Sequence, residues 1–343
     1  MQPGFFDLHD RHQQLEKLGD PLPKLAKAVD WEGFRRLLEK VHQKERKSNA
    51  GRKPFDVVLM FKVLVLQHLY NLADDQTEYQ IRDRYSFCRF LDLTPEGRVP
   101  DAKTIWLFRE RLKTLELVDE LFAELMGQIE AAGYIPRLGQ IVDASMVAAP
   151  RQRNSRDENA TIKEGKTPEE WQDKPAMLRQ KDVDARWTKE HGKTYYGNKN
   201  HISIDREHKL VRHFEVTHAA VHDSQIFDVL LDTSNTSADL WADSAYRSEE
   251  READLKAQGY RSHIQTKGIA EKPLSERAQK VNHRRAKVRV RVEHVFAAQT
   301  AMGGMLVRTV GFARARVKIA MMNIVYNLRR VAFLHVRCAA GTA

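Results

Sequence analysis

Three acidic residues, Asp143, Asp243 and Glu293, have the types and settings that metal-dependent chemistry needs. Asp143 and Asp243 each end a short apolar run that is typical of a strand, and such a side chain can project from the sheet edge into a cleft. Three carboxylates can hold two divalent cations about 4 Å apart, one activating an attacking water or 3′-hydroxyl and the other stabilising the leaving oxygen. We therefore predict that these residues are catalytic and bind Mg²⁺ or Mn²⁺, which favour carboxylate oxygens.

The residues around Glu293 are almost all basic or apolar. From Lys272 to Cys338 the chain has fifteen Lys and Arg residues but only two acids, Glu276 and Glu293. One alternative is an ordinary ion pair with Arg289, one helical turn earlier, which would contribute a few tenths of a kcal/mol. Such a pair does not explain why the rest of the region lacks acids. A surface that binds phosphates should exclude carboxylates except where one must bind a metal, so we interpret Glu293 as a metal ligand.

Basic residues near these acids are candidates for contacts with DNA. The net charge of +10 and the isoelectric point near 9.5 favour an anionic partner. The segment Glu78 to Lys113 could form a helix-turn-helix, although a purely structural helical bundle explains it equally well. Tyr246 could equally be a packing residue. The predicted DNA-contacting residues are Lys103, Arg109, Tyr246, Arg247, Arg284, Arg285, Lys287, Arg289 and Arg291.

The elements that would position these residues change in character at Gly133. Residues 1–132 show helical periodicity and predict an all-helical N-terminal domain. Residues 133–337 follow the order three strands, helix, strand, helix, strand, long helix. This order predicts an α/β domain with a ribonuclease-H-like core, in which helices flank a mixed five-stranded sheet. On such a core the two aspartates and the helical glutamate converge, whereas either aspartate alone would be an ordinary turn residue.

Several local features refine this prediction. Residues 151–194 are polar and low in aliphatic residues, which predicts an insertion between strands in the form of a long loop, either functional or disordered. Asp182 and Asp184 within it are predicted to be solvated, and Asp205 to belong to a turn. Residues 224–231 and 248–258 are predicted helices, and Asp101 is a predicted N-cap.

Composition excludes some classes of protein. The two cysteines lie far apart without a CxxC motif or a Cys/His cluster, which argues against a structural zinc site or a disulfide framework. No apolar run approaches the roughly 18 residues of a membrane span, and the N-terminus does not resemble a signal peptide. We therefore expect a cytoplasmic protein without a membrane partner.

Seven stretches resemble, in order, the DDE transposases of bacterial insertion sequences, close to the group numbered five. They are Gly51-Arg-Lys-Pro-Phe55, Pro100 to Arg109, Ile141-Val-Asp-Ala-Ser145, Tyr196 to His201, Val221-His-Asp-Ser224, Ala242-Asp-Ser-Ala-Tyr246 and Arg289-x-x-x-Glu293-x-x-Phe296. The resemblance implies a catalytic triad at Asp143, Asp243 and Glu293. Related families have Tyr and Lys at the two ends of the last motif, where this chain has Ala286 and Thr300.

The resemblance also implies partners and an activity. A transposase would bind the terminal inverted repeats of its element and target DNA as a homodimer, within a bacterial cytoplasm and its nucleoid, with the helical domain serving DNA binding and dimerisation. It would cleave the element ends and join the 3′-hydroxyl to target DNA by two-metal phosphoryl transfer. Two alternatives stay open: a ribonuclease-H-like nuclease without strand transfer, and a domesticated protein that only binds DNA.

Overall fold

The computed structural model describes residues 7–42, 53–94, 96–152, 154–190, 192–268, 273–339 and 341. Gly51 and Arg52, which open the first family-like motif, lie outside these residues. The chain divides into two compact units, Met1–Ala132 with Ile324–Ala343, and Gly133–Asn323. The predicted second domain extends to residue 337, but helix α14 (Phe312–Ala339) passes through the division at Ile324. The C-terminal part of α14 therefore belongs to the helical unit, a correction that sequence periodicity could not reveal because the helix is continuous.

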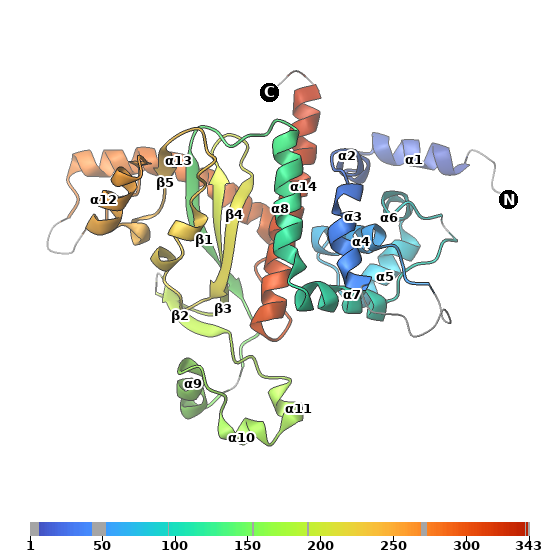
Figure 1. Cartoon of the computed structure of the whole chain (residues 1–343), viewed down its shortest axis with the longest axis horizontal. Helices are drawn as coiled ribbons and strands as arrows, with labels where there is room; N and C mark the ends of the chain where they lie inside the picture. The colour runs from blue at the N-terminus through green and yellow to red at the C-terminus, as the bar shows by residue number, and fades with distance from the viewer. Residues whose placement is uncertain are drawn as a thin grey trace. The chain divides into compact units, whose positions relative to one another are not determined.

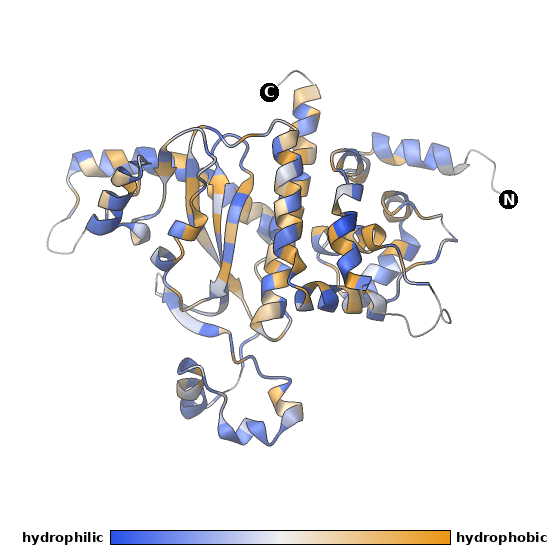
Figure 2. Cartoon of the chain, in the orientation of Figure 1, coloured by the Kyte–Doolittle hydropathy of each residue, from blue (hydrophilic) through white to orange (hydrophobic). Residues whose placement is uncertain are grey.

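The first unit is helical, as predicted. Its helix α4 begins where the Asp56 carboxylate accepts hydrogen bonds from the backbone N–H groups of Val58 and Leu59 at 2.9 and 3.1 Å. Nearly every α4 side chain is buried, and Figure 2 shows this helix in orange. The helices are α1 (Asp7–Lys17), α2 (Leu22–Lys27), α3 (Arg35–Leu38), α4 (Val57–Leu69), α5 (Asp74–Asp83), α6 (Tyr85–Phe90), α7 (Ala102–Thr114) and α8 (Leu117–Ala131), with part of α14.

The predicted N-cap of α7 is confirmed, because the Asp101 carboxylate accepts a hydrogen bond from the backbone N–H of Thr104 at 2.7 Å.

In the described part of the chain no single helix could cross a membrane by length and composition, although α4 and α5 pass that test as a pair bent by 103°.

The second unit is built on a mixed sheet (Figure 1). Strand β1 pairs antiparallel with β3, which pairs antiparallel with β4, while β1 pairs parallel with β5 and β5 parallel with β6. This is the strand arrangement expected for a ribonuclease-H-like core, so the predicted fold class is confirmed. The strands are β1 (Gln140–Ala148), β2 (Arg186–Glu190), β3 (Lys193–Asp205), β4 (Val211–His218), β5 (Asp239–Trp241) and β6 (Arg261–Ser262).

The sheet has six strands where the sequence predicts five. The additional strand, β2, comes from the predicted insertion and pairs antiparallel with the first half of β3. The insertion also contains three short helices, α9 (Arg156–Lys163), α10 (Glu169–Gln172) and α11 (Pro175–Leu178). They enclose the fully buried Trp171, whose indole N–H donates to Glu158 at 2.7 Å. The described residues of this insertion, 151–152, 154–190 and 192–194, are therefore folded, because one large aromatic side chain supplies a core that the polar composition conceals.

Asp182 and Asp184 connect this insertion to α14. The backbone N–H of Gly311 donates to Asp182 at 3.1 Å, and that of Phe312 donates to Asp184 at 3.0 Å. Both carboxylates thus satisfy free N–H groups at the start of α14, where the helix dipole also favours negative charge. Asp182 is only 5% exposed, so the prediction that it is solvated is wrong, whereas Asp184 is partly exposed.

Two predicted boundaries also need correction. Strand β1 continues to Ala148 and does not end at Asp143, because its second half pairs with residues 197–202 of β3. The predicted helix at residues 224–231 is instead two 3-10 turns, Asp223–Gln225 and Asp228–Leu230.

Before β1, Gly139 has a φ of +92°, and a Cβ there would come within 2.4 Å of the Asp239 carbonyl oxygen. Glycine at this position therefore lets β1 and β5 approach each other.

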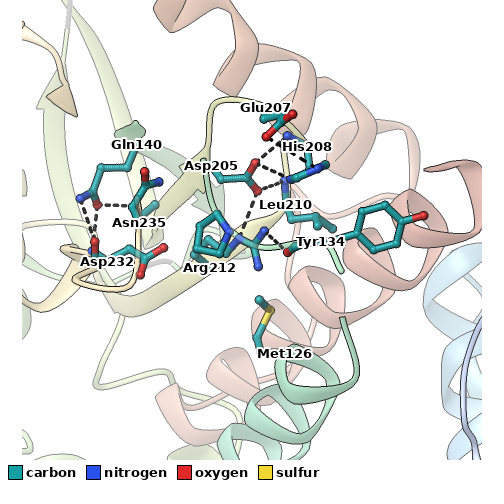
Figure 3. Close-up of polar contacts among 12 residues, drawn as sticks. Met126, Tyr134, Gln140, Asp205, Glu207, His208, Leu210, Arg212, Asp232 and Asn235 are labelled. Carbon is teal, nitrogen blue, oxygen red and sulfur yellow. Dashed lines mark hydrogen bonds and ion pairs between the residues drawn. The ribbon is translucent and has the colours of Figure 1, made fainter. Parts of the chain in front are cut away.

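Asp205 organises the turn between β3 and β4, as predicted, and Figure 3 shows its contacts. The buried carboxylate accepts hydrogen bonds from the backbone N–H groups of His208 and Leu210 and from the Arg212 side chain at 3.1 Å. Arg212 in turn donates to the Tyr134 carbonyl oxygen at 2.8 Å. Asp205 is therefore a structural residue and not a metal ligand.

Two helices, α12 (Glu249–Ala257) and α13 (Glu276–Ala301), pack against the strands of the second unit. Helix α13 contacts β1 and β5, and α12 contacts β6. A fully buried amide network joins β3, α13 and α14: Asn323 exchanges hydrogen bonds with Asn200 at 3.0 Å and accepts one from Gln299 at 2.7 Å. Because buried amides require partners, this network fixes the position of α13, and hence of Glu293, over the sheet.

Candidate active site

Asp143 lies in the middle of β1 and points to the face of the sheet that α13 covers. Its side chain is 12% exposed, and its carboxylate accepts hydrogen bonds from the Ala144 backbone N–H and from Arg289. Burial raises the pKa of Asp143 to about 6, because the charged form loses hydration, while Arg289 acts in the opposite direction. Asp143 is thus a carboxylate whose negative charge needs a cation beside it.

Asp243 lies two residues after the end of the short strand β5. Its carboxylate accepts a hydrogen bond from the Ser244 backbone N–H and thereby caps the 3-10 turn Ser244–Tyr246. Strands β1 and β5 pair only through Gln140 and Ile141 of β1, so the two acids follow the point where the strands separate. With 37% of its side chain exposed, Asp243 faces a more hydrated environment than Asp143.

Arg289 of α13 joins the two aspartates. Its guanidinium lies 2.7 Å from an Asp143 oxygen and 3.5 Å from an Asp243 oxygen, and it also donates to the Gln265 side chain at 2.9 Å. Burial alone would lower the pKa of Arg289, but the neighbouring acids raise it above its ordinary value. Two carboxylates that are 100 positions apart therefore share one cation.

Glu293 is exposed and lies one turn after Arg289 on α13. Its negative charge contributes to the raised pKa values of both Asp143 and Arg289, which places it electrostatically in the same cluster. Among the described residues, however, no group of three or more His, Cys, Asp or Glu side chains is arranged as a metal-binding cluster. In the described arrangement Asp143 and Asp243 both contact Arg289, and Glu293 is exposed one helical turn further along α13.

A polar stripe on α13 attaches this helix to the segment after β6. The Asn282 amide pairs with both backbone groups of Thr266, at 3.0 and 2.9 Å. One turn further along, Arg285 donates to the Ile264 carbonyl oxygen at 2.6 Å. Arg289 continues the stripe, and Glu293 follows it. The sequence analysis missed Asn282 and Gln265, because neither amide belongs to a motif and their partners are set by the tertiary fold.

The predicted DNA contacts fall into different environments. Arg284, Lys287 and Lys103 are exposed, and Arg291 is partly buried. The pKa of Arg291 is lowered by burial and by the neighbouring Arg206. These positions are compatible with contacts to an anionic partner.

Two predicted contacts do not fit an exposed DNA-binding surface. Arg109 makes two hydrogen bonds with Asp74, at 2.7 and 2.8 Å, and one with Gln67 at 2.9 Å, so it stabilises the helical unit. Tyr246 is 1% exposed and packs on Phe227 with ring centroids 5.4 Å apart. Both corrections have the same reason: Arg109 is bonded and Tyr246 is packed inside the fold, and neither the charge of an arginine nor the size of a tyrosine ring indicates this in the sequence.

A buried ion pair joins β3 to the 3-10 turn Asp223–Gln225. The Lys199 ammonium donates to Asp223 at 2.7 Å and to the Val221 carbonyl oxygen at 3.0 Å, with side-chain exposures of 8% and 14% for the two charged residues. Burial raises the pKa of Tyr246, and the negative charges of Asp143 and Asp223 raise it further. His222 caps the 3-10 turn Asp223–Gln225 by accepting a hydrogen bond from the Ser224 backbone N–H, and the pairing of Asp223 with Lys199 was missed by the sequence analysis.

Comparison with known families and structures shows what this chain is similar to. A family model described as a transposase DDE domain matches residues 135–328, and one described as "Transposase domain (DUF772)" matches residues 9–111. A solved structure, the cryo-EM structure of the piggyBac transposase synaptic complex with hairpin DNA, is 12% identical with a TM-score of 0.49, covering 94% of this chain and 76% of that chain.

Proposed function

Since this chain belongs to the transposase DDE domain family, we propose that it is a DNA transposase that cleaves the ends of its element and joins the freed 3′-hydroxyl to target DNA. The observation that carries the proposal is the convergence of Asp143 and Asp243 on one cationic group, with Glu293 one turn away. A shared cation is what two carboxylates of a metal-dependent phosphoryl-transfer site require.

The residues present fit a divalent cation. Asp143, Asp243 and Glu293 would hold Mg²⁺ or Mn²⁺, which supply charge stabilisation at the reacting phosphate and lower the pKa of the attacking hydroxyl. The Arg289 guanidinium is a stand-in cation between the two aspartates. Since it contacts one oxygen of each aspartate, Arg289 would compete with a metal ion for these oxygens. A guanidinium displaced from them would be available to a phosphate of the DNA strand.

The surroundings of the acids also suit DNA. Exposed basic side chains on α13, including Arg284 and Lys287, lie on the same helix as Glu293, and the chain carries a net charge of +10. Such residues bind backbone phosphates without reading sequence and give affinity that falls steeply with salt. We propose that DNA is held along α13 as its scissile phosphate reaches the acids.

The test is cleavage and joining of DNA that carries the sequences flanking the coding region. Wild-type protein with Mg²⁺ or Mn²⁺ should nick the element ends and produce joined molecules, whereas Asp143→Asn, Asp243→Asn and Glu293→Gln should lose at least about 100-fold in rate, because each removes a charge from the reacting centre. Glu250→Gln, an exposed acid on α12, is the matched control and should retain full activity. Full cleavage by any triad variant would overturn the assignment.

The products separate the remaining alternatives. Cleavage without joined molecules would indicate a ribonuclease-H-like nuclease, and metal-independent binding without cleavage would indicate a domesticated DNA-binding protein. Because both element ends must be held together for transfer, we also propose that the chain acts as a homodimer on DNA. Light scattering of the protein with end DNA should then give two chains per complex, and one chain per complex during productive joining would contradict it.

A further inference from the structure

Two arginines from separate elements, each close in sequence to a residue of the acid cluster, meet at one backbone oxygen. Arg247, four residues after Asp243, donates to the Ile264 carbonyl oxygen at 3.2 Å and to the Thr266 hydroxyl at 2.6 Å. Arg285 of α13 donates to the same Ile264 oxygen at 2.6 Å. Two guanidinium groups thus converge on one backbone oxygen two residues after β6, although their positive charges repel each other.

The charge balance at this point is uneven. Glu252 lies 3.5 Å from the Arg247 guanidinium. Burial and then the charge of Arg247 lower the pKa of Arg285, and the more distant Glu252 only partly offsets them. The pair therefore carries more positive than negative charge, and part of the Arg247 side chain, 33%, stays exposed. An anion bound between the two guanidinium groups would remove the repulsion.

The position of the pair identifies the anion. The 3-10 turn Ser244–Tyr246 separates Arg247 from Asp243, and one helical turn separates Arg285 from Arg289, which contacts both aspartates. Tyr246 is held in the core by Phe227, and the Arg251 guanidinium lies over that Phe227 ring, so the turn that carries Arg247 is firmly anchored. A rigidly placed pair of planar guanidinium groups suits the oxygens of a phosphodiester, which accept several N–H donors at once.

We propose that Arg247 and Arg285 together bind one backbone phosphate of the DNA strand adjacent to the scissile phosphate. This inference rests on the proposed function, because it takes the acids as the place of cleavage. The bound phosphate fixes the register of the strand relative to Asp143 and Asp243. Neither arginine takes part in the chemistry itself; each positions the strand.

The test scans the substrate and the protein together. A duplex with the flanking end sequence is prepared with one neutral methylphosphonate at each backbone position in turn, and affinity is measured without metal and with Ca²⁺. Wild-type protein should lose about tenfold in affinity when the clamped phosphate becomes neutral. Arg247→Gln/Arg285→Gln should lose about tenfold on unmodified DNA, show no further loss at that position, and bind with a shallower salt dependence.

The control variant is Lys256→Gln, which removes the same charge from an exposed position on α12. It should keep the wild-type methylphosphonate profile, and Arg247→Lys/Arg285→Lys should recover part of the position-specific loss. A double glutamine variant with an unchanged profile would overturn the inference while the cleavage activity of the wild type still supports a transposase. If the wild type neither binds nor cleaves the end DNA, the proposed function itself fails.

Discussion

Replacing Arg289 with glutamine should destabilise the protein when no metal is present. The Arg289–Asp143 pair has side-chain exposures of 15% and 12%, and removing one partner of a buried ion pair costs about 3–5 kcal/mol. The pKa of Asp143 is already about 6, so proton uptake relieves part of the uncompensated charge, and we expect the lower limit, about 3 kcal/mol. For a unit of this size that corresponds to a melting temperature lower by about 6–12 °C.

The same variant should bind divalent cations more tightly. Arg289 contacts oxygens of both Asp143 and Asp243, so a metal ion must compete with it for these ligands. Removing an interaction of at least 1.4 kcal/mol should raise Mn²⁺ affinity about tenfold or more. Thermal unfolding across a Mn²⁺ titration without DNA measures both effects, because a ligand that binds only the folded state raises its melting temperature.

Arg291→Gln is the matched control, since this arginine lies two residues further along α13 and is influenced by burial and by Arg206. It should respond to Mn²⁺ as the wild type does. If Mn²⁺ raises the melting temperature of Arg289→Gln no more than that of the wild type, Arg289 does not occupy the place of a metal ion, and the reasoning is refuted.

Three further predictions concern stability. Burial lowers the pKa of His201 to about 4, so as the pH falls below 6.5 the unfolded chain binds a proton at this histidine before the folded chain does. The free energy of unfolding, measured with urea, should therefore fall by about 2 kcal/mol between pH 6.5 and pH 5, and this fall should be absent in His201→Gln. An unchanged slope in that variant would contradict this. Asp182→Ala removes the cap of α14 and should cost about 1–2 kcal/mol by the same assay, whereas the exposed Glu170→Ala should change little. Asn323→Ala removes three hydrogen bonds from the buried amides of Asn200 and Gln299, which keep only their longer mutual contact at 3.4 Å, and should cost about 3 kcal/mol; a loss below 1 kcal/mol would rule out the network as a fixed support of α13.

Much of the fold follows from local sequence pattern. The strand at Asp143, the strand before Asp243 and the long basic helix with Glu293 are each specified by short-range periodicity, and the order of these elements indicates their topology. Strand β2 and the small core around Trp171 could not be predicted this way, because polar residues surround a single buried aromatic. The division of α14 between two units is likewise a property of packing and not of helix propensity.

The site was predictable in its residue types but not in its contacts. An acid in a basic region marks Glu293, yet nothing in the sequence indicates that Arg289 bridges Asp143 and Asp243, because that contact joins positions far apart in the chain. Arg109 illustrates the opposite error: its charge predicted a DNA contact, whereas its geometry shows two hydrogen bonds to Asp74. Charge alone identifies a class of partner, and tertiary pairing decides which residues remain available to it.

The number of Mn²⁺ ions bound per chain tests the central claim most directly. Electron paramagnetic resonance can count free and bound Mn²⁺ in the presence of end DNA. With Asp143, Asp243 and Glu293 as the ligands, the wild type should bind two ions, and a variant with all three replaced by their amides should bind none at this site. Equal binding by the wild type and the triple variant would contradict the account.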